Sequence, residues 1–369
     1  MTHIRRWLTP LSWLYGLGAD TRNALFDWGV LPSETYDIPI INVGNLTVGG
    51  TGKTPHVEYL IRLLSGRYRV AVLSRGYRRK SRGYLLATPA STVCDLGDEP
   101  WQIKQKFPEV YVAVDANRRR GIAHLMHDEA TRDVEVILLD DAFQHRYVKA
   151  GQNILLVDYG RLISDDRLLP AGDLRERPSA SRRATTVIVT KCPRHIPAIG
   201  YRAVMLSLQL RPYQQLFFST FAYGTMHKLW GEGTLEPTAL RKENTYVLLL
   251  AGIGNPQQME QDVRRFAQHV TMLTFPDHHY YTRSDADLIR RTLEGLPKPR
   301  IVVTTEKDAA RLQQLQWLDE EVRQSIYVLP IEVDFMRDEK DKFDKTITDY
   351  VRENKRNILM AQGKDSQRA

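Results

Sequence analysis

Short apolar segments alternate with amphipathic or polar stretches along most of the chain. Between residues 39 and 190 the apolar segments have the length of strands and are rich in β-branched residues. This pattern predicts an α/β fold with a mostly parallel sheet that helices cover on both faces. The predicted strands are 39–43, 69–74, 110–114, 134–140, 153–158 and 185–190, and a helix is predicted from about Lys53 to Leu64.

The same alternation returns nearer the C-terminus after an interruption. Residues 205–210 and 216–224 read as strands with Pro212 between them, which predicts an antiparallel ribbon joining two domains. We therefore expect a core domain over 36–204, a β-ribbon linker over 205–238 and a smaller α/β domain over 239–369. In the smaller domain the predicted strands are 246–251, 270–275, 300–305 and 325–330, and the predicted helices are 257–268, 284–295, 308–316 and about 337–355.

The first 35 residues carry a different pattern. They contain Trp7, Trp13 and Trp28, which are half of the six tryptophans, together with several leucines and flanking arginines. An apolar face with Trp, Leu and basic flanks is typical of a helix that lies in a membrane interface. The alternative is a helix that packs this face on the protein core.

Composition places the chain among folded globular proteins. Hydrophobic residues make up 42% and charged residues 26% of the sequence, which excludes a disordered chain or a collagen-like fibre. The net charge of +8 favours anionic partners such as nucleotide phosphates, phosphorylated sugars and anionic lipids. No nucleic acid is expected, because the basic clusters lack interleaved aromatic residues and no nucleic-acid-binding module is recognisable.

The sequence also bears on location. No apolar run approaches the roughly 18–20 residues that a membrane-spanning helix needs, and no signal peptide is recognisable. Cys94 and Cys192 are the only cysteines, so neither a zinc pattern nor a disulfide framework can be built. We expect a reducing compartment, either the cytoplasm or the cytoplasmic face of a membrane.

The strongest motif is a glycine-rich loop between a predicted strand and a predicted helix. Residues 44–55 read GNLTVGGTGKTP, close to the phosphate-binding pattern G-x-x-x-x-G-K-[ST]. Glycines let backbone N–H groups converge on phosphates, and the helix N-terminus adds a favourable dipole. Lys53 can reach the β- and γ-phosphates, and the Thr54 hydroxyl can ligate Mg²⁺. Thr47 stands where the pattern has its first glycine, and the extra glycines that follow supply the turn.

A pair of carboxylates ends another predicted strand. Asp140 and Asp141 follow the apolar run 134–139, and an acidic residue beside a phosphate-binding loop can hold Mg²⁺. Adjacent residues of a strand point to opposite sides, so we expect only one direct ligand and leave open which. Gln144 follows near the same edge. The alternative is a pair of turn or capping carboxylates.

Two further sites carry candidate chemistry. Asp98 and Glu99 precede a predicted helix, where a carboxylate could accept the proton of an alcohol that is being phosphorylated, or could cap the helix. Asp277, His278 and His279 end a strand of the smaller domain, where one histidine could orient a catalytic carboxylate or belong to an ordinary polar loop.

Arginines cluster after three core strands, a pattern suited to phosphate: Arg75, Arg78 and Arg79; Arg118, Arg119 and Arg120; Arg175, Arg177, Arg182 and Arg183.

Together these motifs resemble the tetraacyldisaccharide 4'-kinase family of Gram-negative bacteria, the lipid A 4'-kinases. The resemblance spans nearly the whole chain in the expected order, and the loop with threonine at position 47 is itself the family's form. Residues 170–176 depart from it, because Asp173 stands where the family often has a second proline. The matching segments are 42–55 (NVGNLTVGGTGKTP), 73–77 (LSRGY), 97–100 (GDEP), 139–146 (LDDAFQHR), 170–176 (PAGDLRE), 275–279 (FPDHH) and 303–308 (VTTEKD).

The resemblance implies a role for each matching residue. Asp98 would be the base for the sugar hydroxyl with His278 as its partner, and Asp141 would be catalytic together with Lys53. Whether His278 or His279 reaches Asp98 stays open. Implied nucleotide contacts are Gly49, Gly50, Thr51, Gly52, Lys53, Thr54 and Gln144; implied substrate contacts are Asn45, Arg75, Arg118, Arg175 and Glu176; implied metal ligands are Thr54, Asp140 and Asp141.

The resemblance further implies transfer of the γ-phosphoryl group of ATP, with Mg²⁺, to the 4'-hydroxyl of tetraacyldisaccharide 1-phosphate. Such a substrate lies in a bilayer, which favours a membrane contact through the N-terminal helix at the cytoplasmic face of the inner membrane. No obligate protein partner is expected. The main rival is a nucleotide-switch ATPase or GTPase that binds a protein or membrane partner, and a kinase for a soluble sugar or nucleoside is a weaker one.

Overall fold

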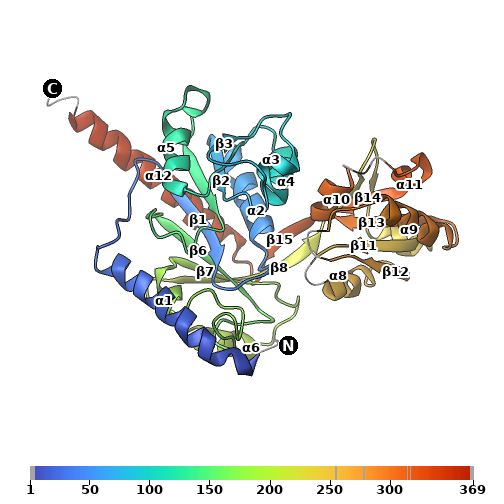
Figure 1. The fold of residues 1–369 in the computed structure, drawn as a ribbon, viewed down its shortest axis with the longest axis horizontal. Helices are drawn as coiled ribbons and strands as arrows, with labels where there is room; N and C mark the ends of the chain where they lie inside the picture. Colours follow the sequence, from blue (N-terminus) through green and yellow to red (C-terminus); the bar gives the residue numbers. More distant parts are fainter. Residues whose placement is uncertain (1–4, 254–255, 277–278, 314, 316, 366–369) are drawn as a thin grey trace. The chain divides into compact units, whose positions relative to one another are not determined.

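A computed structural model of the chain describes residues 5–253, 256–276, 279–313, 315 and 317–365 (Figure 1). The chain folds as two compact units. Unit 1 consists of residues 1–96, 103–221 and 333–369, and unit 2 of residues 97–102 and 222–332. This division differs from the predicted ranges 36–204, 205–238 and 239–369, because the C-terminal helix belongs to the unit that holds the N-terminus.

Unit 1 is built on a nine-stranded sheet in the order β15-β8-β7-β6-β1-β5-β2-β4-β3. The neighbours from β8 through β4 all run parallel, and the short β3 at one edge is antiparallel to β4. The six strands predicted for the core are confirmed to within two residues at each end. The strands are β1 (Ile40–Asn45), β2 (Val70–Ser74), β3 (Leu85–Leu86), β4 (Tyr111–Val114), β5 (Val136–Asp140), β6 (Gln152–Asp158), β7 (Thr186–Thr190), β8 (Gln215–Tyr223) and β15 (Ile331–Phe335).

The helices of unit 1 cover this sheet with regular apolar stripes. In α2 the buried residues Val57, Leu60, Ile61 and Leu64 recur at the spacing of one helix face, and this helix packs on β1, β2 and β5. The predicted helix from Lys53 to Leu64 is thereby confirmed. The helices are η1 (Arg6–Leu8), α1 (Thr9–Asp27), α2 (Lys53–Ser65), α3 (Val93–Leu96), α4 (Asp98–Lys106), α5 (Arg118–His127), η2 (Glu129–Thr131), η3 (Pro178–Arg183), α6 (Ala198–Leu208) and α12 (Lys340–Asp365).

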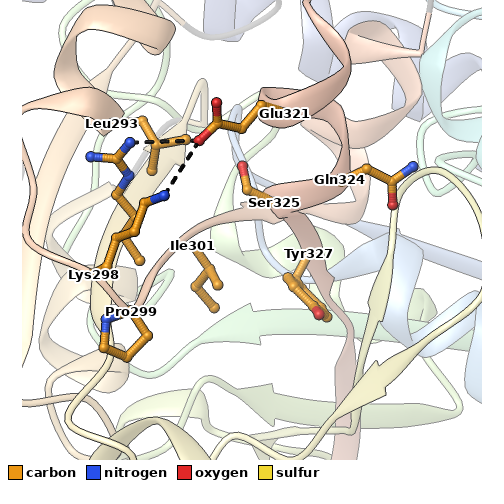
Figure 2. Close-up of a pocket in the computed structure, with 9 residues that line it drawn as sticks. Leu293, Lys298, Pro299, Ile301, Glu321, Gln324, Ser325 and Tyr327 are labelled. Atoms are coloured by element: carbon orange, nitrogen blue, oxygen red, sulfur yellow. Dashed lines mark ion pairs between the residues drawn. The ribbon is translucent and has the colours of Figure 1, made fainter.

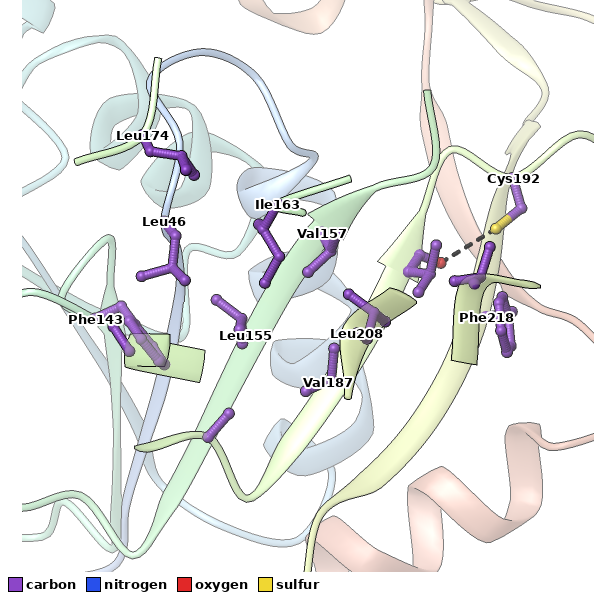
Figure 3. Packing of buried hydrophobic residues seen from close by; sticks show 14 of the residues in the cluster. Leu46, Phe143, Leu155, Val157, Ile163, Leu174, Val187, Cys192, Leu208 and Phe218 are labelled. Carbon is purple, nitrogen blue, oxygen red and sulfur yellow. Dashed lines mark hydrogen bonds between the residues drawn. The ribbon is translucent and has the colours of Figure 1, made fainter. Parts of the chain in front are cut away.

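One hydrophobic cluster joins the phosphate-binding loop to the sheet and to α6 (Figure 3). Leu46 of the loop packs with Leu155 and Val187 of β6 and β7, and Leu208 contributes from α6. The predicted strand at 205–210 and the ribbon linker are therefore wrong, because these residues complete α6 and the following β8 joins the large sheet. Cys192 lies buried in this cluster, and both Cys94 and Cys192 are free thiols.

Unit 2 contains a six-stranded sheet in the order β10-β9-β14-β13-β11-β12. Alternate residues of β11 enter different clusters: Leu248 and Leu250 pack with α9, α10 and α11, whereas Val247 and Leu249 pack with α7 and α8. Helices therefore cover both faces, as predicted for an α/β unit. The elements are β9 (Met226–Lys228), β10 (Thr234–Leu235), α7 (Ala239–Lys242), β11 (Tyr246–Ala251), α8 (Pro256–Val263), β12 (His269–Thr274), α9 (Arg283–Glu294), β13 (Arg300–Thr305), α10 (Glu306–Leu312), α11 (Glu320–Ser325) and β14 (Ile326–Leu329).

The first and last long helices both belong to unit 1. Ser12 and Phe26 of α1 are buried, whereas its Trp13 and Leu14 are 71% and 68% exposed. The C-terminal α12 buries Phe343 in the core. In the part of the chain that the structure describes, neither these helices nor any other is long and apolar enough to cross a membrane.

Candidate active site

The phosphate-binding loop connects the carboxyl end of β1 to the first residue of α2. β1 lies between β5 and β6 in the parallel sheet, so the loops after these three strands emerge at the same edge. The loop ends at Gly52, whose φ of 86° is left-handed. A Cβ atom at Gly52 would lie 2.7 Å from Cζ of Phe221, so the tight approach of the chain there requires glycine.

The loop is held from one side by the segment that carries Arg175. The amide of Val48 donates to the carbonyl of Asp173 at 2.8 Å, and the amide of Arg175 donates to the carbonyl of Leu46 at 2.7 Å. Arg161 donates to the Asp173 carboxylate at 2.7 Å and to the Val48 carbonyl at 2.6 Å. Asp173 therefore anchors this segment through its carboxylate, at the position where the family often has a proline.

A lysine braces the same loop from β7. Lys191 follows β7, and its Nζ donates to the carbonyl of Gly50 and pairs with Asp158 Oδ2 at 2.8 Å. Thr190 donates to the carbonyl of Thr51 at 2.8 Å. The carbonyl oxygens of the loop are thus engaged by β7, which leaves its N–H groups as the donors suited to phosphate.

The adjacent carboxylates Asp140 and Asp141 lie in different environments. Asp140 ends β5, is 1% exposed, and its Oδ2 accepts from the Ser74 hydroxyl at 3.1 Å. Asp141 has a left-handed φ of 47° and faces two cations instead. Lys53 Nζ lies 3.7 Å from Asp141 Oδ1, and Arg175 Nη1 lies 3.2 Å from both carboxylate oxygens.

Asp141 is held as an anion by these neighbours. Burial raises the pKa of Asp141, but the charges of Lys53, Arg175 and Arg118 outweigh burial and lower it below its usual range. Gln144 completes the group, because its Oε1 lies 3.4 Å from Arg175 Nη1. The structure thus brings four of the residues implied by the sequence around the start of α2.

Arg118 is the second buried cation of this group. It is 2% exposed and donates to the carbonyls of Asp115 and Asp140. Burial lowers the pKa of Arg118 to about 10, so the guanidinium stays charged near neutral pH. Its neighbours differ: Arg119 pairs with Glu34, and Arg120 pairs with Asp115. Of this arginine cluster, only the first member turns toward Asp140.

Two residues implied as substrate contacts, Glu176 and Arg75, lie outside the group around Lys53 and Asp141. Glu176 is buried and pairs with Arg183, so the structure gives its carboxylate a protein partner. Arg75 lies at the carboxyl end of β2 with an exposed side chain. Neither residue is shown within bonding distance of Lys53 or Asp141.

Several buried polar atoms around the loop lack a hydrogen-bond partner among the described residues. They include Asn45 Oδ1, Thr51 Oγ1 and His145 Nε2. Buried polar atoms are nearly always satisfied in native proteins, so these atoms are completed by water or by a bound polar ligand. Burial, followed by nearby arginine charges, lowers the pKa of His145 to about 4, so the ring is neutral near neutral pH.

The candidate base Asp98 belongs to a different constellation, within unit 2. It begins α4, and its Oδ2 accepts from Nη2 of Arg311 at 2.6 Å. Arg311 is 5% exposed and also contacts Asp308 at 3.4 Å. Asp308 is fixed in turn, because it accepts from the Gly252 amide at 2.9 Å and from the Thr305 hydroxyl at 2.8 Å.

The histidine loop of unit 2 is described only in part. Asp277 and His278, including the predicted partner of Asp98, lie outside the described residues. His279 Nε2 lies 2.9 Å from Asp285 Oδ2 of α9, and its ring stacks on Phe275 at a centroid distance of 5.0 Å. The contacts of the His279 ring with Asp285 and Phe275 therefore stabilise the loop to which His279 belongs.

The structure also bears on the predicted metal ligands. Among the residues that it describes, no group of three or more His, Cys, Asp and Glu side chains is arranged to hold a metal ion. Mg²⁺ in kinases is usually bound by one or two carboxylates plus substrate phosphates, so a complete protein cage is not required. The buried Asp140 carboxylate at the end of β5, with Thr54 in the first turn of α2, fits that kind of partial site.

A surface pocket of about 610 Å³ in unit 2 contains none of the predicted site residues (Figure 2). Its two cations, Lys298 and Arg300, approach Glu321 at 3.9 and 3.8 Å. Glu321 offsets one of the two positive charges, and none of the residues implied for phosphate binding lines this pocket.

Sequence reasoning missed Arg311, Ser74 and the bracing residue Asp158. Arg311 is 213 positions from Asp98, and nothing in its local pattern distinguishes it from a surface arginine. Ser74 lies within the segment 73–77 that matches the family, and this match could have identified it as a site residue. Lys191 follows a predicted strand, but nothing in the sequence around it predicts its contact with the phosphate-binding loop.

The sequence matches the family described as tetraacyldisaccharide-1-P 4'-kinase over residues 4–352. It is 50% identical to the tetraacyldisaccharide 4'-kinase of Phocaeicola vulgatus, over 96% of this chain and 97% of the relative. It is 48% identical to that of Bacteroides fragilis over 99% and 98%. A crystal structure of LpxK from Aquifex aeolicus in complex with ATP superimposes with a TM-score of 0.72 and 30% identity, over 94% of this chain and 99% of that one. The chain therefore belongs to the tetraacyldisaccharide-1-P 4'-kinase family.

Proposed function

We propose that this chain transfers the γ-phosphoryl group of ATP to the 4'-hydroxyl of tetraacyldisaccharide 1-phosphate, a step of lipid A biosynthesis. The observation that carries this proposal is the group of Lys53, Asp141 and Arg175 at the glycine-rich loop that begins α2. The relatives named as tetraacyldisaccharide 4'-kinases support the reaction, and the ATP held by the Aquifex aeolicus protein supports the phosphoryl donor.

In this proposal the loop binds the nucleotide. The N–H groups of Gly49 to Gly52 and the Thr51 hydroxyl bind the phosphates, and Lys53 neutralises charge on the β- and γ-phosphates. Asp140 and Thr54 would hold Mg²⁺, which supplies charge neutralisation on the phosphates when bound. Asp141 holds Lys53 and Arg175 in place before the nucleotide arrives.

We assign Asp98 the role of the base that accepts the proton of the 4'-hydroxyl, with His278 as its partner. Arg311 supports this assignment, because a buried arginine at 2.6 Å fixes the orientation of the carboxylate. The contact of His279 with Asp285 supports His278 as the histidine that serves Asp98. Gln144 stays a proposed nucleotide contact. The proposed substrate contacts are Asn45, Arg75, Arg118, Arg175 and Glu176, of which Glu176 pairs with Arg183.

The lipid substrate requires the enzyme to work at a bilayer. The exposed apolar residues of α1 include Leu11, Trp13, Leu14 and Leu17, and Trp7 precedes the helix. Exposed tryptophan and leucine on a helix with basic flanks suit the membrane interface. We therefore propose that α1 binds the cytoplasmic face of the inner membrane, as a monotopic contact.

The test uses γ-labelled ATP, Mg²⁺ and detergent-dispersed tetraacyldisaccharide 1-phosphate. We expect label on the lipid with the unmodified protein and its loss in Lys53→Ala, because the loop then lacks the cation for the γ-phosphate. The control is Lys149→Ala, which removes an exposed lysine of the same unit and keeps the activity. Label found only as free phosphate, despite ATP binding, would instead indicate a switch ATPase that binds a partner.

A further inference from the structure

Helix α6 is apolar on the side that faces away from the protein. Val204 and Leu208 are buried in the core cluster of unit 1. On the remainder of the helix, Ile199 and Leu206 are 77% and 68% exposed, and Met205 is also exposed. A surface helix normally carries mostly polar residues opposite its buried stripe, so an exposed side with three large apolar residues around the single charged Arg202 indicates a partner.

The surroundings of α6 carry positive charge without any carboxylate nearby in the sequence. No Asp or Glu occurs between Glu176 and Glu232. Arg194, Arg202 and Arg211, before, within and after the helix, are exposed. One exposed carboxylate, Asp165, lies at the edge of this surface, because it accepts from Ser164, which contacts Ser207 of α6. Apolar side chains flanked by an excess of arginine are complementary to anionic lipid head groups over a hydrocarbon layer.

The helix is connected through one loop to α1. Ser12 of α1 donates to the carbonyl of Leu168 at 3.0 Å, and Ser164 and Ser207 form a hydroxyl hydrogen bond at 2.5 Å. Leu168 also packs against the core cluster that contains Val204 and Leu208 of α6. The two helices thus flank the segment 164–171, and both are visible in Figure 1 as parts of unit 1.

We propose that α6 is a second membrane-binding element, which places Ile199 and Leu206 in the interface of an anionic bilayer beside α1. This inference rests on the proposed function in assuming that the enzyme works at a bilayer. The inference goes beyond the proposed function, because two helices fix the orientation of unit 1 on the membrane. A single helix would leave unit 1 free to rotate about the axis of that helix. Arg202 would lie at the level of the head groups.

The test measures co-sedimentation of the full chain with vesicles of phosphatidylethanolamine and phosphatidylglycerol. Ile199→Gln/Leu206→Gln is expected to lower the partition coefficient roughly tenfold, because two apolar side chains no longer leave water on binding. The matched control is Leu288→Gln, an exposed leucine of α9 in unit 2, which leaves binding unchanged. The variant Ile199→Leu/Leu206→Ile keeps the apolar area and is expected to bind vesicles as strongly as the unmodified chain.

Two further measurements separate the proposals. The α6 variant retains phosphoryl transfer to substrate dispersed in detergent, so a loss of vesicle binding with intact transfer supports α6 and leaves the kinase assignment standing. Leu14→Gln/Leu17→Gln reports on α1 independently. Unchanged vesicle binding of the α6 variant overturns the inference. So does a shift from dimer to monomer by analytical ultracentrifugation in the α6 variant without vesicles, because the face would then bind a second copy of this chain.

Discussion

At the scale of single residues, the neighbouring carboxylates Asp140 and Asp141 show what sequence can and cannot determine. The sequence placed both at the end of one strand, but their different surroundings do not come from strand alternation, because β5 ends at Asp140 and Asp141 has a left-handed φ. It could not assign them, because their partners Ser74, Lys53 and Arg175 come from three other segments. We propose that the buried Asp140 is the metal ligand of the pair.

Gly52→Ala should abolish ATP binding while the protein still folds. Its left-handed φ disfavours a side chain, and the new Cβ would press on Phe221, so the start of α2 and the loop amides must move. The measurement is the dissociation constant for ATP by calorimetry. Gly66→Ala, at the other end of α2, meets nothing within 4 Å and is expected to bind ATP normally. Equal affinity in both variants would contradict the prediction.

Arg311→Gln should lower kcat by roughly ten- to a hundredfold and change the KM for ATP little, because a displaced Asp98 affects proton acceptance and leaves the phosphate loop intact. The measurement is steady-state phosphoryl transfer in detergent. Arg290→Gln removes an arginine that pairs with carboxylates on the surface of α9 and serves as the control.

Folding must be checked for this variant, since Arg311 also neutralises the buried Asp308. Arg311→Lys keeps the charge and should fold, but it loses the fixed geometry of the guanidinium. Its kcat is therefore expected between those of Arg311→Gln and the unmodified chain. A parallel rise in KM for ATP would rule out the assigned role.

At the scale of elements, β3, β9, β10 and β15 were not predicted, but the parallel strands of both sheets could be, because their apolar runs are short and bounded by turns. Helix α6 could not, and its residues 205–210 were predicted as a strand. The exposed Leu206 and the buried Leu208 are separated by the polar Ser207, and this alternation has the period of a strand although the residues belong to a helix. The unusual surface of α6 and the failure of the prediction thus have the same origin.

The C-terminal helix offers a test of element packing. The hydroxyl of Tyr350 in α12 donates to the Ile40 carbonyl and accepts from the Ile40 amide, both at 3.1 Å. Tyr350→Phe leaves two backbone groups at the start of β1 without this partner and should cost about 1–3 kcal/mol of stability. The measurement is the midpoint of urea unfolding. Tyr213→Phe, at an exposed tyrosine, should shift the midpoint little.

At the scale of the whole molecule, stability should fall as the pH drops below about 6.5. His56 is fully buried between the Gly52 carbonyl at 2.7 Å and Ser219 at 3.0 Å, and burial lowers its pKa to about 4. Because the unfolded chain binds a proton at higher pH than the folded chain, the stabilisation is complete above pH 6.5 and is lost as the pH falls toward 4. His145 titrates in the same direction.

The expected loss between pH 7 and pH 5 is about 2 kcal/mol from His56 alone, from the difference in pKa. Urea unfolding at the two pH values measures it. In His56→Gln the dependence on pH should shrink, whereas His127→Gln, an exposed histidine of α5, should leave it unchanged. If the free energy of unfolding of His56→Gln depended on pH as strongly as that of the unmodified chain, other groups would be responsible for the loss of stability at low pH.

The path of the chain through the two units also determines the order in which it can fold during synthesis. Residues 222–332 emerge from the ribosome as one nearly complete unit, whereas unit 1 lacks β15 and α12 until the last segment has been translated. The exposed Trp7, Trp13 and Trp28, within and beside α1, are made first and precede the finished sheet by about three hundred residues. Under the proposal that α1 binds the membrane, a nascent chain presents this helix long before unit 1 is complete, so delivery to the membrane can begin while translation is still in progress.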